Sequence, residues 1–170
     1  YYTDSHWRQE RITKVADEIA AQMGAERIGT CEIQDTGRPF YGVYYGQAAL
    51  PHAPERLFYL DNAVIRGLKV YNVETQSDIP VYDLGAAAGR DPYEMFLGGA
   101  RSIIKITNPN AAQERRLIVF RDSFGSSIAP LLAAGYSEIT LVDIRYISPL
   151  SLGKLIDFTK ADDVLFLYSA

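Results

Sequence analysis

The second half of the chain alternates short apolar runs with segments of helical periodicity. Residues 126–134 and 150–160 carry apolar positions at helical spacing. The runs around them are rich in β-branched and aromatic residues, as strands are: 102–106 (SIIKI), 116–120 (RLIVF), 138–144 (EITLVDI) and 163–168 (DVLFLY). Strands that alternate with helices build parallel sheets, and the central runs are apolar enough to be covered on both faces. The pattern predicts a three-layer α/β domain around a mostly parallel sheet.

A helix is also expected near the start of the chain. Apolar residues recur at helical spacing over residues 12–23, and Gly24 is suited to end that helix. Thr3 and Asp4, which come before this pattern, are both residue types that cap helices.

The middle of the chain is less regular. Residues 56–60 and 68–74 have the composition of strands, and 79–84 is a candidate third strand. Residues 35–54 are rich in Gly, Pro and Tyr and have few periodic apolar positions. We expect an irregular or short-stranded excursion there and regard it as a candidate cover for a functional site.

Length and composition fit one globular domain. The chain has 170 residues, of which 48% are hydrophobic and 22% charged, so it is long enough to bury a sizeable core. No run approaches the roughly 18 apolar residues that a membrane span needs, and no signal peptide is recognised. Because the chain opens at Tyr1 rather than Met, residues 1–170 are expected to be one domain of a longer precursor.

The net charge and the few Cys and His residues limit the kinds of partner and reaction that the chain can have. The net charge of −4 gives no support to a nucleic-acid or anionic-membrane partner. Cys31 is the only cysteine, which excludes an internal disulfide and a cysteine-based metal cluster. His6 and His52 do not have the spacing of zinc ligands. These features favour chemistry without metal or cofactor, or plain binding.

The segment LIVFRDSFGSSIAPLLAAG, residues 117–135, runs from a predicted strand into a predicted helix. Ser123 falls at the junction, beyond the carboxyl end of the strand, where ligands bind in open α/β sheets. Backbone N–H groups and the helix dipole would favour a developing negative charge there, and Gly125 allows a tight turn. The alternative is that Ser123 is an ordinary helix cap.

A serine nucleophile needs a base, and the base needs an orienting group. His6 lies two residues after Asp4, whose carboxylate is suited to accept a hydrogen bond from one ring nitrogen while the other faces Ser123. Alternatively, Asp4 caps the helix and His6 is a surface residue. His52 fits a solvated loop residue better.

Several motifs together resemble the DHHW protein family, an SGNH-hydrolase-like group related to alginate O-acetyltransferase-type proteins. They are TDSHW at 3–7, FYG at 40–42, MFLGGARSIIKITNP at 95–109 and RDSFGSSIAPLLAAGYSEITLVDIRY at 121–146. The resemblance implies an SGNH-hydrolase-like (flavodoxin-like) fold and a triad of Ser123 as nucleophile, His6 as general base and Asp4 as its orienting partner. It also implies a carbohydrate or acetylated polysaccharide as substrate and an extracytoplasmic or cell-surface location.

The chain departs from the family pattern at two positions. Ser5 stands where the family name indicates a second histidine, outside the implied triad. Ala100 follows the Gly98–Gly99 pair where the family often has Asn, which removes a side-chain donor for an oxyanion. Backbone N–H groups of Ser123 and Gly99 remain as candidate donors, and the loss of one donor lowers a rate by about 10² or more.

Arg145 and Asp122 carry alternative interpretations. Arg145 follows a predicted strand end and is a candidate ligand for an anionic sugar or the acyl oxygen, or else pairs with Asp122 or Asp143. Asp122 suggests an aspartyl nucleophile for phosphoryl transfer, but the sequence offers no second nearby Asp or carboxylate cluster for a metal.

Tyr41, Tyr44 and Tyr45 are candidates for stacking on sugar rings, or they pack on the core of their own loop.

Two hypotheses for the function follow from the whole sequence. The first is a serine-dependent carbohydrate O-acetyl esterase or O-acyltransferase. The second, favoured by Ala100, is a non-catalytic carbohydrate-binding or assembly module on the same fold.

Overall fold

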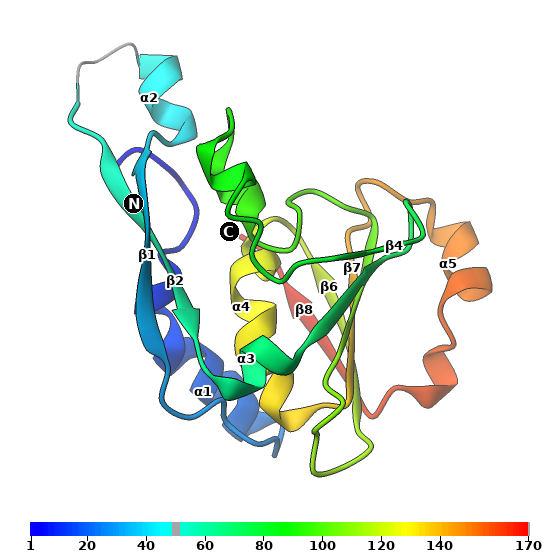
Figure 1. Ribbon diagram of the computed structural model, residues 1–170. Helices are drawn as coiled ribbons and strands as arrows, with labels where there is room; N and C mark the ends of the chain where they lie inside the picture. The colour runs from blue at the N-terminus through cyan, green and yellow to red at the C-terminus, as the bar shows by residue number, and fades with distance from the viewer. Residues whose placement is uncertain (49–51, 170) are drawn as a thin grey trace.

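The computed structural model describes residues 1–48 and 52–169 (Figure 1). The helices are α1 (Thr13–Gln22), α2 (Val43–Ala48), α3 (Ala63–Gly67), α4 (Phe124–Leu132) and α5 (Pro149–Leu155). The strands are β1 (Glu32–Phe40), β2 (Glu55–Asp61), β3 (Lys69–Asn72), β4 (Ser77–Ile79), β5 (Ile103–Thr107), β6 (Arg116–Arg121), β7 (Glu138–Val142) and β8 (Asp163–Leu167). Short 3₁₀ turns are η1 (Gln9–Arg11), η2 (Ala86–Ala88), η3 (Pro92–Met95), η4 (Ala133–Gly135) and η5 (Phe158–Lys160).

The main sheet is mixed, so the prediction of a mostly parallel sheet is wrong, and the SGNH-hydrolase-like (flavodoxin-like) fold stays a prediction. Its six strands lie in the order β4-β3-β5-β7-β6-β8. β6 is parallel to both β7 and β8, whereas the pairs β3–β4, β3–β5 and β5–β7 are antiparallel. Residues 108–115 connect β5 to β6 without a helix, and parallel strands need a crossover of about a dozen residues or more. The chain therefore reverses direction at this loop.

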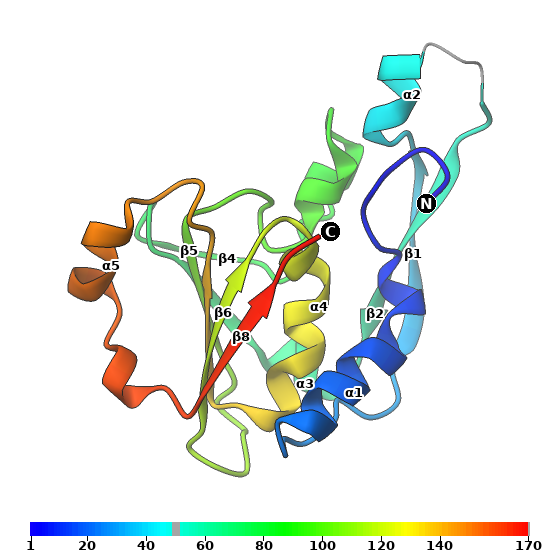
Figure 2. The ribbon, with the colours of Figure 1, turned by 180° about the vertical axis from the view of Figure 1, so that it is seen from behind.

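The connections around β6 put helices on opposite faces of the sheet. The chain crosses from β6 through α4 to β7, and then returns through α5 past β6 to β8. Because such crossovers are right-handed and these two run in opposite directions, α4 and α5 lie on opposite faces (Figures 1 and 2). This arrangement leaves space for a site beyond the carboxyl end of β6.

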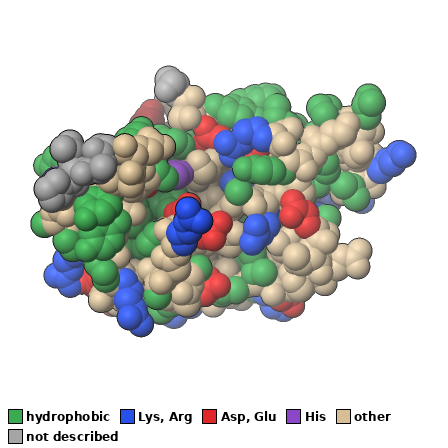
Figure 3. All heavy atoms as spheres, turned by 90° about the horizontal axis from the view of Figure 1, so that it is seen from above, with side chains coloured by type: hydrophobic (Ala, Val, Ile, Leu, Met, Phe, Trp, Pro, Cys, Tyr) green, Lys and Arg blue, Asp and Glu red, His purple; other side chains and the backbone are tan. Residues whose placement is uncertain are grey.

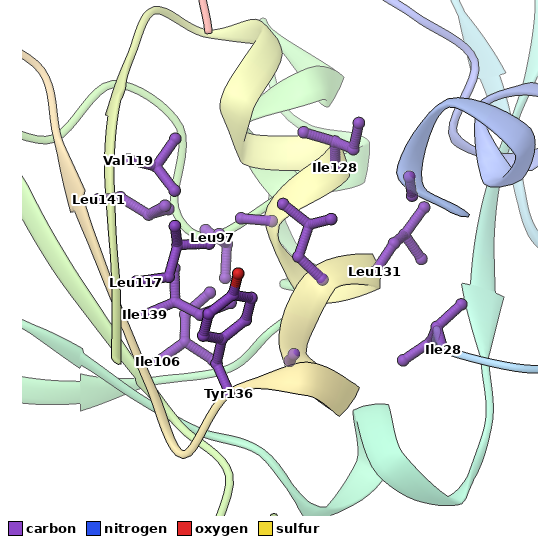
Figure 4. Packing of buried hydrophobic residues seen from close by; sticks show 14 of the residues in the cluster. Ile28, Leu97, Ile106, Leu117, Val119, Ile128, Leu131, Tyr136, Ile139 and Leu141 are labelled. Atoms are coloured by element: carbon purple, nitrogen blue, oxygen red, sulfur yellow. The ribbon is translucent and has the colours of Figure 1, made fainter. Parts of the chain in front are cut away.

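The largest core cluster lies between the sheet and α4, and α1 packs against α4 from the other side. Figure 4 shows strand side chains pointing toward α4. The buried residues that meet there include Leu117, Val119, Ile139, Leu141, Ile128 and Leu131.

Most predicted elements of the second half are confirmed, with shifted bounds. Residues 102–106, 116–120, 138–144 and 163–168 correspond to β5, β6, β7 and β8. The predicted helix 126–134 is α4 followed by η4, whereas the predicted helix 150–160 is interrupted, because α5 ends at Leu155 and only η5 follows.

The first half differs more from expectation. Residues 35–40 belong to the nine-residue strand β1, which pairs antiparallel with β2, and α2 follows, so this region is more regular than expected. Residues 49–51 of the predicted excursion lie outside the described residues. The candidate strand 79–84 is reduced to the end of β4 and an isolated bridge between Tyr82 and Phe96.

The predicted first helix is confirmed as α1, but neither Thr3 nor Asp4 caps it. The helix begins at Thr13, and its N-cap, Ile12, contributes no side-chain hydrogen bond. Within residues 1–48 and 52–169, no helix is both long and apolar enough to cross a membrane.

Candidate active site

The turn between β6 and α4 carries Ser123. Ser123 occupies the N-cap position of α4, yet its side chain makes no capping hydrogen bond, so the simple helix-cap alternative is wrong. The Asp122 side chain caps the helix instead, because its Oδ1 accepts a hydrogen bond from Phe124 N at 3.0 Å. Asp122 Oδ2 accepts two bonds of 2.8 Å from Ser169, which ties the turn to the segment after β8. The Ser123 hydroxyl is thus left for other partners.

Asp4 is held by the segment between β1 and α2. Val43 N donates to Asp4 Oδ2 at 3.0 Å, and Gly42 N donates to Thr3 Oγ1 at 3.1 Å. A Cβ at Gly42 would lie only 2.1 Å from the carbonyl oxygen of Thr3, so only glycine allows this approach. Glu55 of β2 also accepts hydrogen bonds from the Thr3 N–H and hydroxyl. The strand ribbon formed by β1 and β2 therefore fixes the segment that carries the carboxylate.

His6 joins Asp4 to Ser123. His6 Nδ1 lies 2.5 Å from Asp4 Oδ1, and His6 Nε2 lies 2.8 Å from Ser123 Oγ. Burial raises the pKa of Asp4, but hydrogen bonds from His6 and Val43 lower it more, so that the pKa is below its ordinary value of 3.8. An ionised Asp4 only accepts, which assigns the proton of the neutral ring to Nδ1 and leaves Nε2 to accept from the serine hydroxyl.

Aromatic rings hold the imidazole in this orientation. The His6 ring stacks on Tyr93 of η3, with centroids 4.1 Å apart and an angle of 20° between the planes. Phe124 lies on another side at 5.4 Å and also packs edge-on against Trp7. The Tyr93 hydroxyl donates to the Trp7 carbonyl at 3.1 Å, and burial raises the pKa of Tyr93, so it remains a neutral donor. Only 13% of the His6 side chain is exposed.

Gln9 connects the segment that carries His6 to the rest of the fold. Its fully buried amide donates to the carbonyl of Ser127 in α4 at 2.7 Å and accepts from Leu60 N in β2 at 2.7 Å. The same nitrogen lies 3.1 Å from the Tyr82 hydroxyl. One side chain thus links the N-terminal segment, the strand ribbon and the helix that follows Ser123.

A buried arginine supports the serine turn from within the sheet. Arg121 is 0% exposed, and its Nη1 donates to the carbonyl of Asp122 at 3.3 Å and to Ser126 Oγ at 3.1 Å. Asp143 Oδ2 lies 4.0 Å away, and Gly125 leaves room for the arginine stem. Burial lowers the pKa of Arg121, while Asp143 offsets part of this effect.

The candidate oxyanion donors are not equivalent. Gly99 N–H already donates to the Phe96 carbonyl at 3.1 Å, which counts against the prediction that it serves an oxyanion. Ala100 has no side-chain donor. In the described part of the chain, Ser123 N–H has no hydrogen-bond acceptor, so it is the better candidate donor.

The contacts of Arg145 and Asp122 favour structural roles for both residues. Arg145 forms a two-point pair with Asp143, with Nε at 2.9 Å from Oδ1 and Nη2 at 2.6 Å from Oδ2, so the salt-bridge interpretation holds. Its contact with substrate stays a prediction. The Asp122 carboxylate is buried and occupied by Phe124 and Ser169. Residues 1–48 and 52–169 contain no group of three or more His, Cys, Asp or Glu suited to a metal ion.

The remaining predicted residues lie outside the hydrogen-bonded trio. Tyr41 is 42% exposed and packs against Tyr45 with ring centroids 4.7 Å apart, at the edge of a groove beside the trio. The groove-lining residues do not include Tyr44. His52 is exposed and bonds only its neighbour Ala53 among the described residues.

Comparison with protein families matches residues 1–142 to the family described as DHHW protein. The chain belongs to the DHHW protein family. In this DHHW chain the tetrapeptide is Asp4-Ser5-His6-Trp7, and Ser5 is exposed, away from the hydrogen bonds of the trio. A search of curated proteins finds no match.

Solved structures share the fold. A DHHW family protein from Eubacterium siraeum has a TM-score of 0.71 at 23% identity, over 98% of this chain and 57% of that one. Bacillus cereus PatB1 with a sulfonyl adduct has a TM-score of 0.77 at 22% identity, over 99% and 59%. Another PatB1 structure has a TM-score of 0.70 at 20% identity, over 99% and 61%. The chain therefore spans about three fifths of the length of these structures.

Motifs in the sequence indicate the trio but not the residues that support it. Tyr93, Gln9 and Arg121 carry no recognisable motif, because their roles depend on contacts between distant segments. Gly42, next to Tyr41 in the FYG motif, was the one support with a signal, since a glycine among large residues indicates a close approach. The catalytic roles of Ser123, His6 and Asp4 stay predictions.

Proposed function

We propose that this protein is a serine-dependent O-acetyl esterase or O-acyltransferase acting on carbohydrate esters, with SGNH-hydrolase-like chemistry. The observation that carries the proposal is the unbroken path of hydrogen bonds from Ser123 Oγ through His6 to Asp4. Nucleophile, base and orienting group are the three parts that such catalysis requires, and each is within hydrogen-bond distance of the next.

In the first half-reaction, Ser123 Oγ attacks the carbonyl carbon of an acetyl ester while its proton passes to His6 Nε2. Asp4 stabilises the imidazolium through Nδ1–H. The negative charge on the former carbonyl oxygen is stabilised by a hydrogen bond from Ser123 N–H at the start of α4. The tetrahedral intermediate collapses, the sugar hydroxyl leaves with the proton from His6 Nε2, and the acetyl group remains on Ser123.

In the second half-reaction, an incoming hydroxyl attacks the acetyl group while His6 Nε2 takes its proton. Collapse of the second intermediate breaks the bond to Ser123 Oγ, which recovers the proton from His6. Water as acceptor releases acetic acid, so the enzyme is an esterase. A sugar hydroxyl as acceptor forms a new ester, so the enzyme is a transferase.

A carbohydrate substrate and an extracytoplasmic or cell-surface location are part of the proposal, because the resemblance to the DHHW family implies both. Similarity to PatB1, which has been solved with a sulfonyl adduct, supports a test with sulfonyl reagents, because sulfonyl fluorides modify activated hydroxyl groups.

The test compares wild type with Ser123→Ala and, as a matched control, Ser5→Ala. We expect wild type and Ser5→Ala to hydrolyse 4-nitrophenyl acetate and to gain the mass of one phenylmethanesulfonyl group on Ser123. Ser123→Ala should lose the labelling and at least about 10⁴-fold in kcat/KM. Equal activity of wild type and Ser123→Ala would refute the proposal.

The second candidate is a carbohydrate-binding or assembly module without turnover. It is favoured by Ala100 and by the Gly99 N–H, which is already bonded to Phe96, because both reduce the donors for an oxyanion. Binding of an oligosaccharide without hydrolysis of its esters or of 4-nitrophenyl acetate, and without labelling of Ser123, would establish this candidate instead.

A further inference from the structure

A groove of about 630 Å³ lies between α2 and η3, next to the hydrogen-bonded trio. One wall is formed by the segment around Tyr41 and Tyr45, and the other by Arg90, Asp91 and Glu94. In both ribbon views, α2 and the short helices before β5 rise on the two sides of this space (Figures 1 and 2). Viewed from above, hydrophobic side chains gather on the α2 side, and charges of both signs lie across the middle of this face (Figure 3).

Both walls belong to segments that contact the trio. Val43 lines the groove, and its N–H holds Asp4 Oδ2. Asp91 and Glu94 line the other wall and flank Tyr93, whose ring stacks on His6. A ligand in the groove therefore lies against the two segments that orient Asp4 and His6.

The groove combines exposed aromatic surface with charged groups. Tyr41 and Tyr45 form a tilted pair at the rim, and Tyr41 is 42% exposed. Arg90, Asp91 and Glu94 are exposed, and none of them forms an ion pair with another described residue. A sugar ring offers C–H groups that pack on aromatic faces and hydroxyl groups that pair with carboxylates and guanidinium. The groove has both kinds of partner.

The charge of the lining selects among glycans. The lining contains two carboxylates, Asp91 and Glu94, and one guanidinium, Arg90, in a chain of net charge −4. A polyuronate would add a carboxylate at each sugar and be repelled, whereas a neutral sugar would not. We propose that the groove between α2 and η3 binds a neutral glycan chain and discriminates against polyuronates. This inference rests on the function proposed above, since it names the substrate class that reaches Ser123.

The first arm of the test measures how much the groove contributes to the turnover of glycan esters. Substrates are acetylated xylo-oligosaccharides, acetylated oligogalacturonates and 4-nitrophenyl acetate, which is too small to need the groove. We expect Tyr41→Ala/Tyr45→Ala to lower kcat/KM for the acetylated xylo-oligosaccharide by at least about tenfold more than it lowers kcat/KM for 4-nitrophenyl acetate. Tyr44→Ala is the control: Tyr44 lies on α2 with Tyr45 but does not line the groove, so this variant should leave both rates unchanged.

The second arm measures charge selection. Glu94→Lys should shift the ratio of kcat/KM for the two glycans by about tenfold toward the oligogalacturonate, and Glu94→Gln by less. The inference is overturned if the double tyrosine variant behaves like Tyr44→Ala, or if wild type prefers the oligogalacturonate.

A binding measurement separates this inference from the proposed function. Xylohexaose and the hexamer of galacturonic acid are titrated into Ser123→Ala by calorimetry. Tighter binding of xylohexaose that is lost in a variant also carrying Tyr41→Ala/Tyr45→Ala supports the groove even if wild type hydrolyses no ester. Equal binding of the two hexamers, or no binding of either, overturns the inference while esterase activity toward 4-nitrophenyl acetate still stands.

Discussion

His6 and Ser123 are 117 positions apart in the sequence, and their Nε2 and Oγ atoms lie 2.8 Å apart. The N-terminal segment reaches the carboxyl end of β6 because Gly42 and Val43 bind its Thr3–Asp4 part. This contact brings the only suitable Asp-His pair to the serine turn. Each of the following predictions changes one residue that helps to hold His6 beside Ser123.

Asp4→Asn should abolish most of the activity. The amide offers an N–H toward Nδ1, which moves the imidazole proton to Nε2, so the ring no longer accepts from Ser123. We expect kcat for 4-nitrophenyl acetate to fall by about 10³ to 10⁴-fold with little change in KM. The exposed Asp78→Asn is the control. Wild-type kcat in Asp4→Asn would show that Asp4 does not orient the ring.

Asp4 should also contribute to stability in a pH-dependent way. Because its pKa in the folded protein is below the ordinary value of 3.8, the ionised carboxylate stabilises the fold above that value, and the contribution is lost as pH falls through the lower pKa. The difference in unfolding free energy between wild type and Asp4→Asn should therefore be larger at about pH 6 than at about pH 2.5. Urea unfolding at both pH values measures it. A difference that grows on acidification would contradict the lowered pKa.

The sequence predicted the strands of the second half because they are continuous apolar runs, and it failed on their direction. Apolar runs such as 102–106 indicate that a strand is buried on both faces. β5 is buried in this way because it lies in the centre of the sheet, although both of its neighbours are antiparallel to it. The signal for reversal was the segment 108–115, where no helical pattern separates two strands. Connection length, rather than strand composition, was the informative feature.

The candidate trio was accessible from the sequence because only two histidines are present and one of them follows Asp4 closely. The stack of His6 on Tyr93 was not accessible, since nothing in the sequence pairs residue 6 with residue 93. The contact that counts against Gly99 as an oxyanion donor was also hidden, because it depends on the turn in which Gly99 N–H bonds to the Phe96 carbonyl.

Tyr93 is predicted to act through the orientation of His6. Tyr93→Phe keeps the ring stacked on the imidazole and removes the hydroxyl with its bond to the Trp7 carbonyl, so kcat should stay within about threefold of wild type. Tyr93→Leu removes the stack, and a misplaced base lowers kcat by about 10²-fold. Steady-state kinetics with 4-nitrophenyl acetate, on samples that thermal melting shows to be folded, test this. Equal kcat for the Phe and Leu variants would exclude an orienting role.

Gly42→Ala should disturb the site through the backbone. The added methyl group would meet the Thr3 carbonyl oxygen at 2.1 Å and Asp4 Cβ at 2.4 Å, so the N-terminal segment must move away. We expect a loss of about 1 to 3 kcal/mol in stability and of about 10²-fold in kcat. Gly153→Ala, where nothing lies within 4 Å of the added atom, is the matched control for urea unfolding and kinetics. If both variants retain wild-type kcat, the close approach of Gly42 is not needed for the site.

Gln9 offers a test of whether the N-terminal segment is held by buried polar contacts. Gln9→Met keeps the volume of the side chain but leaves Leu60 N–H without its acceptor and removes the bond to the Ser127 carbonyl. A buried donor without a partner costs about 1 to 3 kcal/mol, so the urea midpoint should fall by the corresponding amount. Gln22→Met changes an exposed glutamine on α1 and should leave the midpoint unchanged.

Because Gln9 follows His6 closely in the N-terminal segment, kcat of Gln9→Met should also fall at temperatures where the variant is folded. A stability loss without any change in kcat would mean that contacts made without Gln9 suffice to keep His6 at Ser123. The chief ones are the bond from Val43 N–H to Asp4 and the stack of Tyr93 on His6.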